Sequence, residues 1–380
     1  APAVDAPATR PSPPAPAPTQ AGPRATLSDA ELEQLVAASH SPAVEAAAAE
    51  LAELERAFGH LAKNAKNEEI GEDRDKLVAG FKSLRAKVAL LDAGLQPHFY
   101  RAMNAISPYY FQGLNIILEF DRTNKVTGKI EHVWNTCNIT SLSMTLEALG
   151  KSAADYKHQE LIPPIAKVFQ KDVDVKAHDK VGSELAGLRL PDYIAMAAIV
   201  WQMKYRTGSE QAILAGGNNA FNSVPSAHAI ATLARDFGAP AKQGALTLAA
   251  SGKADSTPGA LDDFAKTHWK QADNQATKET GDKATAEERG TKAGRLSSAE
   301  IERKVPLERY KQAVLAQIGP ELDAGRQVVV GQWHHFVRLQ AVTDEFVIKD
   351  DPGHYTGSNE RATWEEARAM GLFLNWVVIG

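Results

Sequence analysis

Strand-forming segments of this 380-residue chain gather near its C-terminal end, after a long series of helical patterns. Short runs rich in β-branched and aromatic residues, separated by turn residues, are typical of an antiparallel sheet. Helices that come first and strands that come last define the α+β class, in which the two kinds of element are segregated along the chain. The predicted strands are residues 327–331, 336–342, 346–349 and 374–379.

The composition excludes two classes of protein. Hydrophobic residues make up 44% and charged residues 23% of the chain, and the formal net charge is -5. A nucleic-acid-binding protein would carry a basic surface, so no nucleic-acid partner is expected. The longest apolar stretch, residues 193–201, is far shorter than the roughly 18 residues that cross a bilayer, so no membrane span is expected.

The first 110 residues divide into a leader and a helical region. Residues 1–25 are dominated by Ala and Pro, which predicts a disordered leader, either a tether or a dispensable tail. Because the chain begins with Ala1 rather than Met, any targeting signal would be missing from it. Residues 26–110 carry helical patterns without a cluster of catalytic residue types, so we expect a packing or docking region.

Residues 111–380 are predicted to form the main domain, entered through a segment of aromatics and turn formers at residues 94–129. Within the domain, residues 247–298 are polar and contain few large apolar side chains. This composition predicts a long inserted loop. Loops of such length inside a domain are usually lids or disordered insertions.

Cys137 is the only cysteine, which excludes an intramolecular disulfide and a thiolate metal cluster. It precedes a predicted helix at residues 140–149, where unpaired backbone amides and the helix dipole favour a thiolate. The alternative is a buried cysteine that acts as a small hydrophobic residue. A nucleophilic cysteine also needs a base and a group that orients the base. A histidine at a strand start, His334 or His335, and an acid at the end of the next strand, Asp350 or Asp351, supply these roles.

Three segments resemble the C39-like branch of the papain-fold cysteine peptidases. TCNITSLSMTLEALG resembles the family's nucleophile helix, GRQVVVGQWHHFVRLQAVTDEFVIKDDPG is similar to its strand, His-Phe-Val, strand and Asp-Pro run, and TWEEARAMGLFLNWVVIG is similar to its final helix and strand. The resemblance covers about residues 115–380 without the polar insertion. It implies a papain-like domain with Cys137 as nucleophile, His335 as base and Asp351 as orienting acid.

The resemblance also implies an activity: amide hydrolysis through an acyl-enzyme, with no cofactor. The substrate would be a peptide or the peptide of bacterial peptidoglycan. The leader would suit a secreted, periplasmic or injected enzyme with an immunity or delivery partner. The alternative is a non-catalytic binding module that has kept the fold.

This alternative is motivated by the oxyanion donor. The family usually places a Gln a short way upstream of the cysteine, and the nearest one here is the distant Gln112. The candidates are Asn135, Asn124 or, if protonated, Glu119, and the sequence leaves the donor open.

Strand alternation distinguishes His335 from its neighbour His334. The face of His335 is apolar and is expected to pack toward the helix of Cys137, whereas the face with Arg338 and Gln340 is expected to meet solvent or the polar insertion. Asp351 is preferred to Asp350 because Pro352 ends the strand, and alternation is a poor guide at a strand's last residue.

Two further clusters have alternative interpretations. His334, His335 and His354 with Asp350 and Asp351 are residue types that bind zinc, although no H-E-x-x-H helix accompanies them. Trp134 and Trp333 lie close in sequence to the proposed catalytic residues and would line a substrate cleft or pack in the core.

Overall fold

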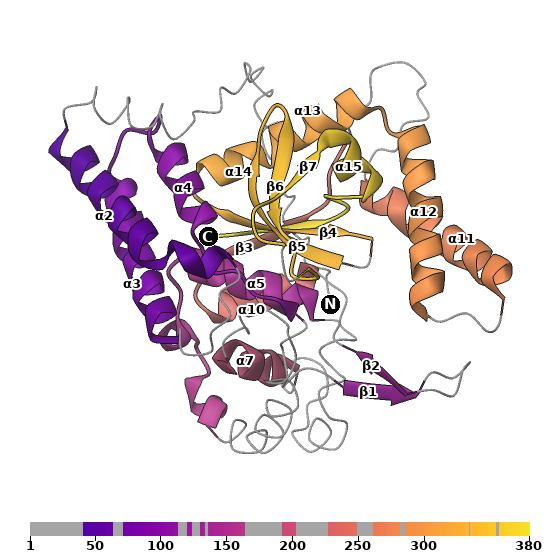
Figure 1. Ribbon diagram of the computed structural model, residues 1–380, viewed down its shortest axis with the longest axis horizontal. Coiled ribbons are helices and arrows are strands. Elements are labelled where there is room, and N and C mark those ends of the chain that lie inside the picture. Colours follow the sequence, from indigo (N-terminus) through magenta and orange to yellow (C-terminus); the bar gives the residue numbers. More distant parts are fainter. Residues whose placement is uncertain are drawn as a thin grey trace, which may run out of the picture.

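The computed structural model describes residues 41–63, 71–112, 120–123, 130–133, 136–163, 192–202, 227–248, 261–281, 286–333, 335–354 and 357–380. They form an α+β structure in which helices surround an antiparallel sheet (Figure 1). None of the described helices is long and apolar enough to cross a membrane. The helices are α2 (Pro42–Phe58), η1 (Gly59–Lys63), α3 (Gly71–Val88), α4 (Gln96–Ala105), α5 (Cys137–Ala148), η5 (Ala153–Asp155), η6 (Gln159–Leu161), α7 (Asp192–Gln202), α10 (Ala227–Asp236), α11 (Leu261–Thr280), α12 (Ala286–Lys304), α13 (Leu307–Gln317), α14 (Gly319–Asp323) and α15 (Trp364–Ala369).

The main sheet has six strands in the order β3-β8-β4-β5-β6-β7, and every neighbouring pair is antiparallel. The four predicted strands are all present, and the two edge strands β3 and β7 were not predicted. Both are short and polar, which is a common way for edge strands to avoid pairing with other chains. A separate hairpin pairs β1 with β2. The strands are β1 (Phe120–Thr123), β2 (Ile130–Val133), β3 (Ala241–Gly244), β4 (Gln327–Gln332), β5 (His335–Val342), β6 (Phe346–Asp350), β7 (Glu360–Thr363) and β8 (Trp376–Ile379).

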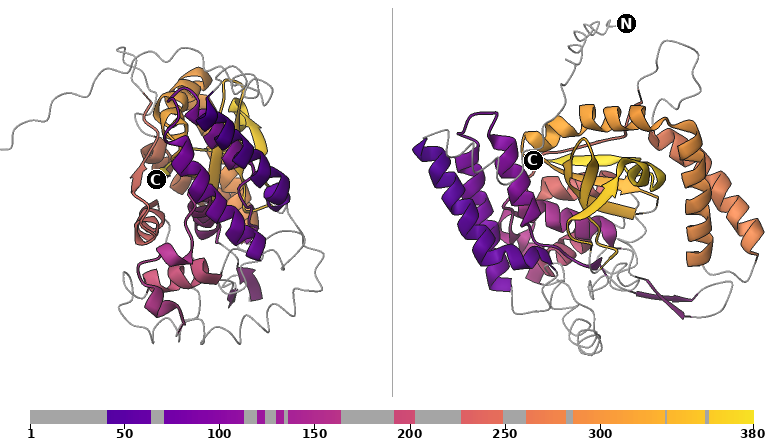
Figure 2. Two further views of the ribbon diagram at one scale, coloured as in Figure 1. Left: turned by 90° about the vertical axis from the view of Figure 1, so that its left-hand side faces the viewer. Right: turned by 45° about the horizontal axis from the view of Figure 1, so that its top comes forward.

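The sheet separates two hydrophobic cores (Figures 1 and 2). On one face, Val329 and Val377 pack with residues of α5, α7 and α10. On the other face, Val330 and Val337 pack with residues of α13 and α15. Because β-strand side chains alternate, neighbouring valines of β4 serve opposite cores, which explains why β4 is almost continuously apolar.

The N-terminal helices belong to the first of these cores. The apolar stripe of α2, with its i, i+3, i+7 spacing, and the corresponding stripe of α3 are buried in the same cluster as α5. Helix α4 was not predicted, and it joins this core as well. The hydrophobic core therefore continues across the domain boundary expected near residue 110. The buried residues of the three helices are Val44, Ala47, Leu51 and Leu54, then Leu77, Phe81, Leu84 and Val88, then Phe99, Tyr100 and Met103.

The faces of β5 are reversed relative to the prediction. Phe336 packs against the core that contains α5, whereas Val337 and Leu339 pack against α13 and α15. Arg338 is fully buried instead of facing solvent. The prediction was wrong because a charged residue in a strand suggests exposure unless distant partners satisfy it.

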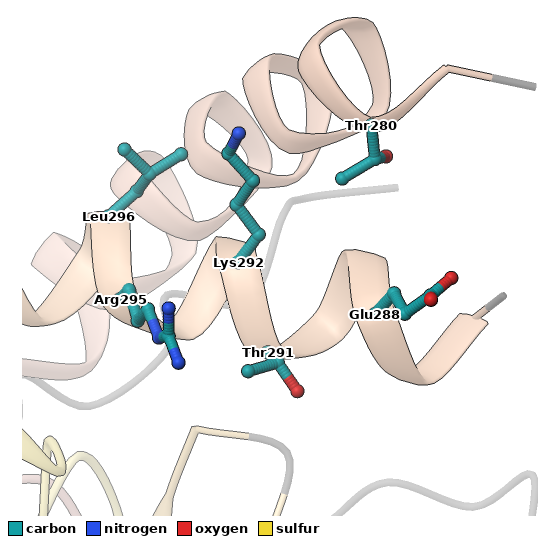
Figure 3. Close-up of a pocket in the computed structure, with 6 residues that line it drawn as sticks. All are labelled: Thr280, Glu288, Thr291, Lys292, Arg295 and Leu296. Atoms are coloured by element: carbon teal, nitrogen blue, oxygen red, sulfur yellow. The ribbon is translucent and has the colours of Figure 1, made fainter. Parts of the chain in front are cut away.

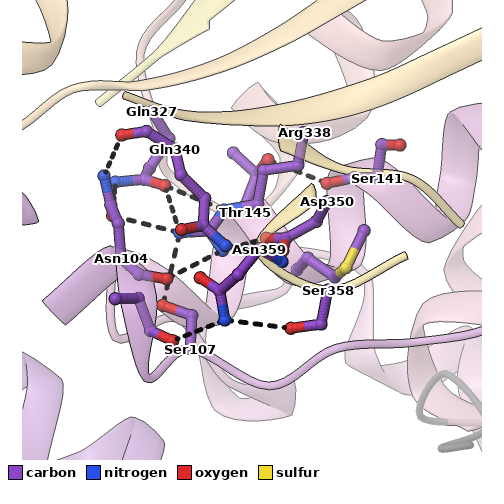
Figure 4. A network of polar contacts seen from close by, with 12 residues as sticks. Asn104, Ser107, Ser141, Thr145, Gln327, Arg338, Gln340, Asp350, Ser358 and Asn359 are labelled. Carbon is purple, nitrogen blue, oxygen red and sulfur yellow. Dashed lines mark hydrogen bonds and ion pairs between the residues drawn. The ribbon is translucent and has the colours of Figure 1, made fainter. Parts of the chain in front are cut away.

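Those partners form a buried polar network (Figure 4). The Arg338 guanidinium lies 2.8 Å from Asp350 Oδ2, and 3.0 Å from both Asn104 Oδ1 and Gln327 Oε1. Gln340 Nε2 donates to Asp350 Oδ1 at 2.5 Å. The network fastens α4 to β4, β5 and β6.

Two helices occupy much of residues 247–298, where a loop was expected. They form the hairpin α11–α12, which projects from the side of the sheet (Figure 2). Its small core consists of Ala272, Ala276 and Ala293 with the partly buried Trp269 and Leu296. Because alanine supports close helix packing while contributing little hydrophobicity, the composition resembled that of a loop.

A pocket of about 570 Å³ lies in this hairpin (Figure 3). Lys292, which lines it, pairs with Glu279 of α11 at 2.5 Å. None of the residues predicted for catalysis contributes to it. The lining residues are Thr280, Glu288, Thr291, Lys292, Arg295 and Leu296.

Candidate active site

Cys137 is the first residue of α5, which begins three residues earlier than predicted. The Thr140 N–H and hydroxyl both bond to Thr136 O, at 3.0 and 2.7 Å, and so fix the first turn. The amides that precede the first helical hydrogen bond have no partner within the helix. Every residue of α5 is buried, and Cys137 itself is 9% exposed. The thiol therefore lies at the positive end of a rigid, buried helix.

His335 and Asp351 meet at the end of the sheet next to this helix. His335 Nε2 lies 2.6 Å from Asp351 Oδ1, and the Gly353 N–H donates to the same oxygen at 2.9 Å. Asp350, the competing acid, pairs with Arg338 in the buried network instead. The structure thus brings Asp351 to His335, as the Asp-Pro motif suggested.

The turn that carries Asp351 is held tightly. Tyr109, which follows α4, donates its hydroxyl to Asp351 O at 2.6 Å. The Asp351 N–H bonds to Gly357 O at 2.9 Å. A Cβ at Gly357 would lie 2.2 Å from Asp351 O, so only glycine permits this approach. The backbone of the acid is thereby fixed from two sides.

The charges of the three residues are coupled. Burial alone would lower the pKa of His335, but the electrostatic interaction with Cys137 and hydrogen bonds with Asp351 and Cys137 raise it to about 10. Burial likewise opposes ionisation of Asp351, but the hydrogen bond and charge of His335, together with Lys349, hold its pKa well below the usual range. Because Nε2 of His335 faces Asp351, Nδ1 is the ring nitrogen left for Cys137.

Gln112 is a site residue that the sequence reasoning set aside. Its backbone N–H donates to Pro352 O at 2.9 Å, and its carbonyl accepts from Thr136 Oγ1 at 3.4 Å. It thus joins the residue before Cys137 to the residue after Asp351. Its side-chain Oε1 is buried and has no hydrogen-bond partner among the described residues. The long sequence separation from Cys137 hid this proximity, because the β1–β2 hairpin lies between them.

Several other predicted residues lie outside the described residues. They are the oxyanion candidates Asn135, Asn124 and Glu119, together with Trp134 and His334.

Trp333 lines a cavity at the end of the sheet where β5 begins with His335. Its ring stacks on Trp269 of α11 with centroids 5.7 Å apart, and its Nε1 donates to Ala369 O at 3.2 Å. The cavity has a volume of about 660 Å³ and lies between α12, β7, α15 and the β4–β5 turn. Glu360 also lines it. Trp333 is therefore both a packing residue and part of a cavity wall.

A cluster of possible metal ligands lies around Asp351, but Lys349 contacts the same carboxylates. Asp351, His354 and Glu360 offer ligand atoms within 4.8 Å of one another. Lys349 Nζ, however, lies 2.9 Å from both Asp351 Oδ2 and Glu360 Oε2. An ammonium group already neutralises these two carboxylates, so the cluster does not fit a divalent cation.

No protein-family model, curated protein or solved structure matches this chain. The geometry of the site is therefore the basis for a functional proposal.

Proposed function

We propose that the chain is a cysteine hydrolase that cleaves amide bonds, with Cys137, His335 and Asp351 as its catalytic residues. The fold we infer is a papain-like domain of the C39-like type, extended by the N-terminal helices and the α11–α12 hairpin. One observation carries the proposal: His335 Nε2 lies 2.6 Å from Asp351 Oδ1, and the interactions with Cys137, the first residue of α5, and with Asp351 both raise the pKa of His335. This coupling supports a Cys-His-Asp triad.

In the proposed mechanism, the Cys137 thiolate attacks the carbonyl carbon of the substrate. His335, charged in the resting site, then protonates the leaving amine, and the acyl-enzyme is released by a water molecule that His335 deprotonates. Asp351 fixes the imidazole so that Nδ1 faces the thiol. The Cys137 backbone N–H and the side-chain amide of Gln112 are the groups we assign to the oxyanion.

The assignment of Gln112 rests on its buried side-chain Oε1, which has no hydrogen-bond partner among the described residues, and on its backbone contact with Thr136, the residue before Cys137. The amide oxygen and nitrogen exchange places by rotation about one bond, so the donor end can face the site. Gln112→Ala is expected to lower turnover about a hundredfold with little change in KM, the usual cost of one oxyanion donor. Unchanged turnover would mean that Gln112 is not the oxyanion donor and would leave Asn135, Asn124 and Glu119 as the candidates.

The substrate we propose is a peptide, either of a protein or of bacterial peptidoglycan. Mass spectrometry of a peptide library and of purified peptidoglycan after incubation with the protein distinguishes the two. Cys137→Ala is the matched control, because it removes the thiol but little volume. Products that form equally with this variant would contradict the proposal.

Alkylation of Cys137 by iodoacetamide tests the nucleophile without any substrate. A thiolate at neutral pH reacts faster than a model thiol. Labelling no faster than that of a model thiol would favour the alternative, a binding module without catalysis.

A further inference from the structure

Lys349 is a buried lysine inside a β-strand, a position where lysine is rare. It lies in β6, opposite Leu339 of β5 and Glu360 of β7, and its side chain is only 1% exposed. Burying an unpaired ammonium costs several kcal/mol, so a buried lysine requires compensating charges. Two carboxylates supply them, Asp351 and Glu360, each 2.9 Å from Nζ.

The two oxygens of Asp351 have different partners. Oδ1 faces His335 Nε2 and the Gly353 N–H, whereas Oδ2 accepts from Lys349. A carboxylate that is bonded through both oxygens cannot rotate about its Cβ–Cγ bond without losing one of them. Lys349 therefore determines which oxygen is presented to the imidazole.

Glu360 holds the ammonium from the other side. It is the cross-strand neighbour of Lys349 and is more exposed than Asp351, with 34% of its side chain accessible. His354 Nδ1 lies 3.8 Å from the same Glu360 oxygen. Positive and negative side chains thus alternate along the contacts from His335 through Asp351 and Lys349 to Glu360.

We propose that Lys349 is a positioning residue of the site: it orients the Asp351 carboxylate toward His335 and balances its charge, and Glu360 holds Lys349 in place. This inference rests on the proposed function, since it concerns the same triad. It assigns a task to two residues that no motif singled out.

The proposal makes an electrostatic prediction that a purely structural role would not make. Loss of a positive charge raises the pKa of every nearby group, and loss of a negative charge lowers it. Among the described residues, the other titratable groups around this cluster include Cys137 of α5, the Tyr109 hydroxyl, Asp350 and His354. Burial and the nearby carboxylates raise the pKa of Tyr109, so this group stays neutral throughout the test.

The test is the pH dependence of Cys137 alkylation in Lys349→Met and Glu360→Gln, measured by mass spectrometry. In Lys349→Met, the alkaline limb of the pH–rate profile, where His335 loses its proton, is expected to move to higher pH by about one unit. This is the effect of a unit charge several Å away at an effective dielectric constant of about 20. Glu360→Gln is expected to move it to lower pH by less. Lys76→Met is the control, because it removes the same charge from an exposed pair with Glu72 on α3.

The outcomes are distinguishable. If wild-type Cys137 reacts no faster than a model thiol, the proposed function itself fails. If wild-type Cys137 is reactive but the limb in a folded Lys349→Met variant stays where it was, Lys349 is only structural and the inference is overturned. If that variant does not fold, Glu360→Gln decides: a shift to lower pH supports the proposal, and no shift or an upward one overturns it.

Discussion

Asp350 and Asp351 are adjacent in sequence and equally buried, yet they belong to two different networks. Asp350 neutralises Arg338 inside the polar network that joins α4 to the sheet. Asp351 contacts His335 near the start of α5, and Lys349 in turn contacts Asp351. Asp350 is the last residue of β6, whereas Asp351 lies in the turn that follows, and this difference of one position separates a structural acid from a candidate catalytic one.

The pKa values of the two acids follow their surroundings in opposite directions. Burial raises the pKa of Asp350 despite the charge of Arg338 and its hydrogen bonds. The pKa of Asp351 is lowered, because His335 and Lys349 together outweigh its burial. The single buried cation beside Asp350 thus offsets the effect of burial on the carboxylate pKa less than the two cations beside Asp351 do. Burial alone is therefore a poor indicator of which acid serves a site.

The largest expected effect is on turnover in Asp351→Asn. The amide cannot stabilise the imidazolium, so turnover is expected to fall by about 10³–10⁴-fold, the size seen when a triad acid is neutralised. The assay is turnover on whichever peptide the substrate screen identifies. A larger loss in Asp350→Asn, per folded molecule, would reverse the assignment of the two acids.

The second effect concerns stability and falls on the other network. Asp350→Asn leaves the buried guanidinium of Arg338 without a counter-charge, so we expect a loss of about 3–5 kcal/mol in the free energy of unfolding. Turnover of the folded fraction should be retained. Urea unfolding measures the first quantity, and activity normalised to native protein measures the second.

A double variant sharpens this contrast. Arg338→Met combined with Asp350→Leu removes both charges and is expected to be closer to wild type in stability than either single variant, because replacing a buried ion pair by apolar residues is often neutral. The coupling free energy from the four unfolding curves is the measurement. Additive losses would mean that the hydrogen bonds to Asn104 and Gln327, rather than the ion pair, carry the stability.

The sequence was informative where a residue's neighbours in the chain decide its structure. Val328, Val329 and Val330 predict a buried strand whatever surrounds them, and the Asp-Pro turn selected the acid that contacts His335. The α+β class followed from the order of such segments.

The sequence failed where distant residues decide the outcome. Arg338 is buried only because α4 and β4 provide acceptors, and no local pattern reveals these. Gln112 was judged by its spacing from Cys137, although a hairpin between them brings it close. The helices α11 and α12 were hidden because their shared core consists largely of alanine.

The smallest expected effect concerns the titration of His335 and compares the two acids directly. The pKa of His335 is raised from 6.5 to about 10, so the charged imidazole contributes stability that is fully present below pH 6.5 and is lost as the pH rises through about 10. Asp351→Asn removes one cause of this shift and should lower the pKa of His335, as should Cys137→Ala. Asp350→Asn should leave it unchanged, because the charge of Asp350 is compensated by Arg338. NMR titration of the imidazole measures all three. An equal shift in Asp350→Asn would mean that the two networks form one electrostatic unit despite their separate hydrogen bonds.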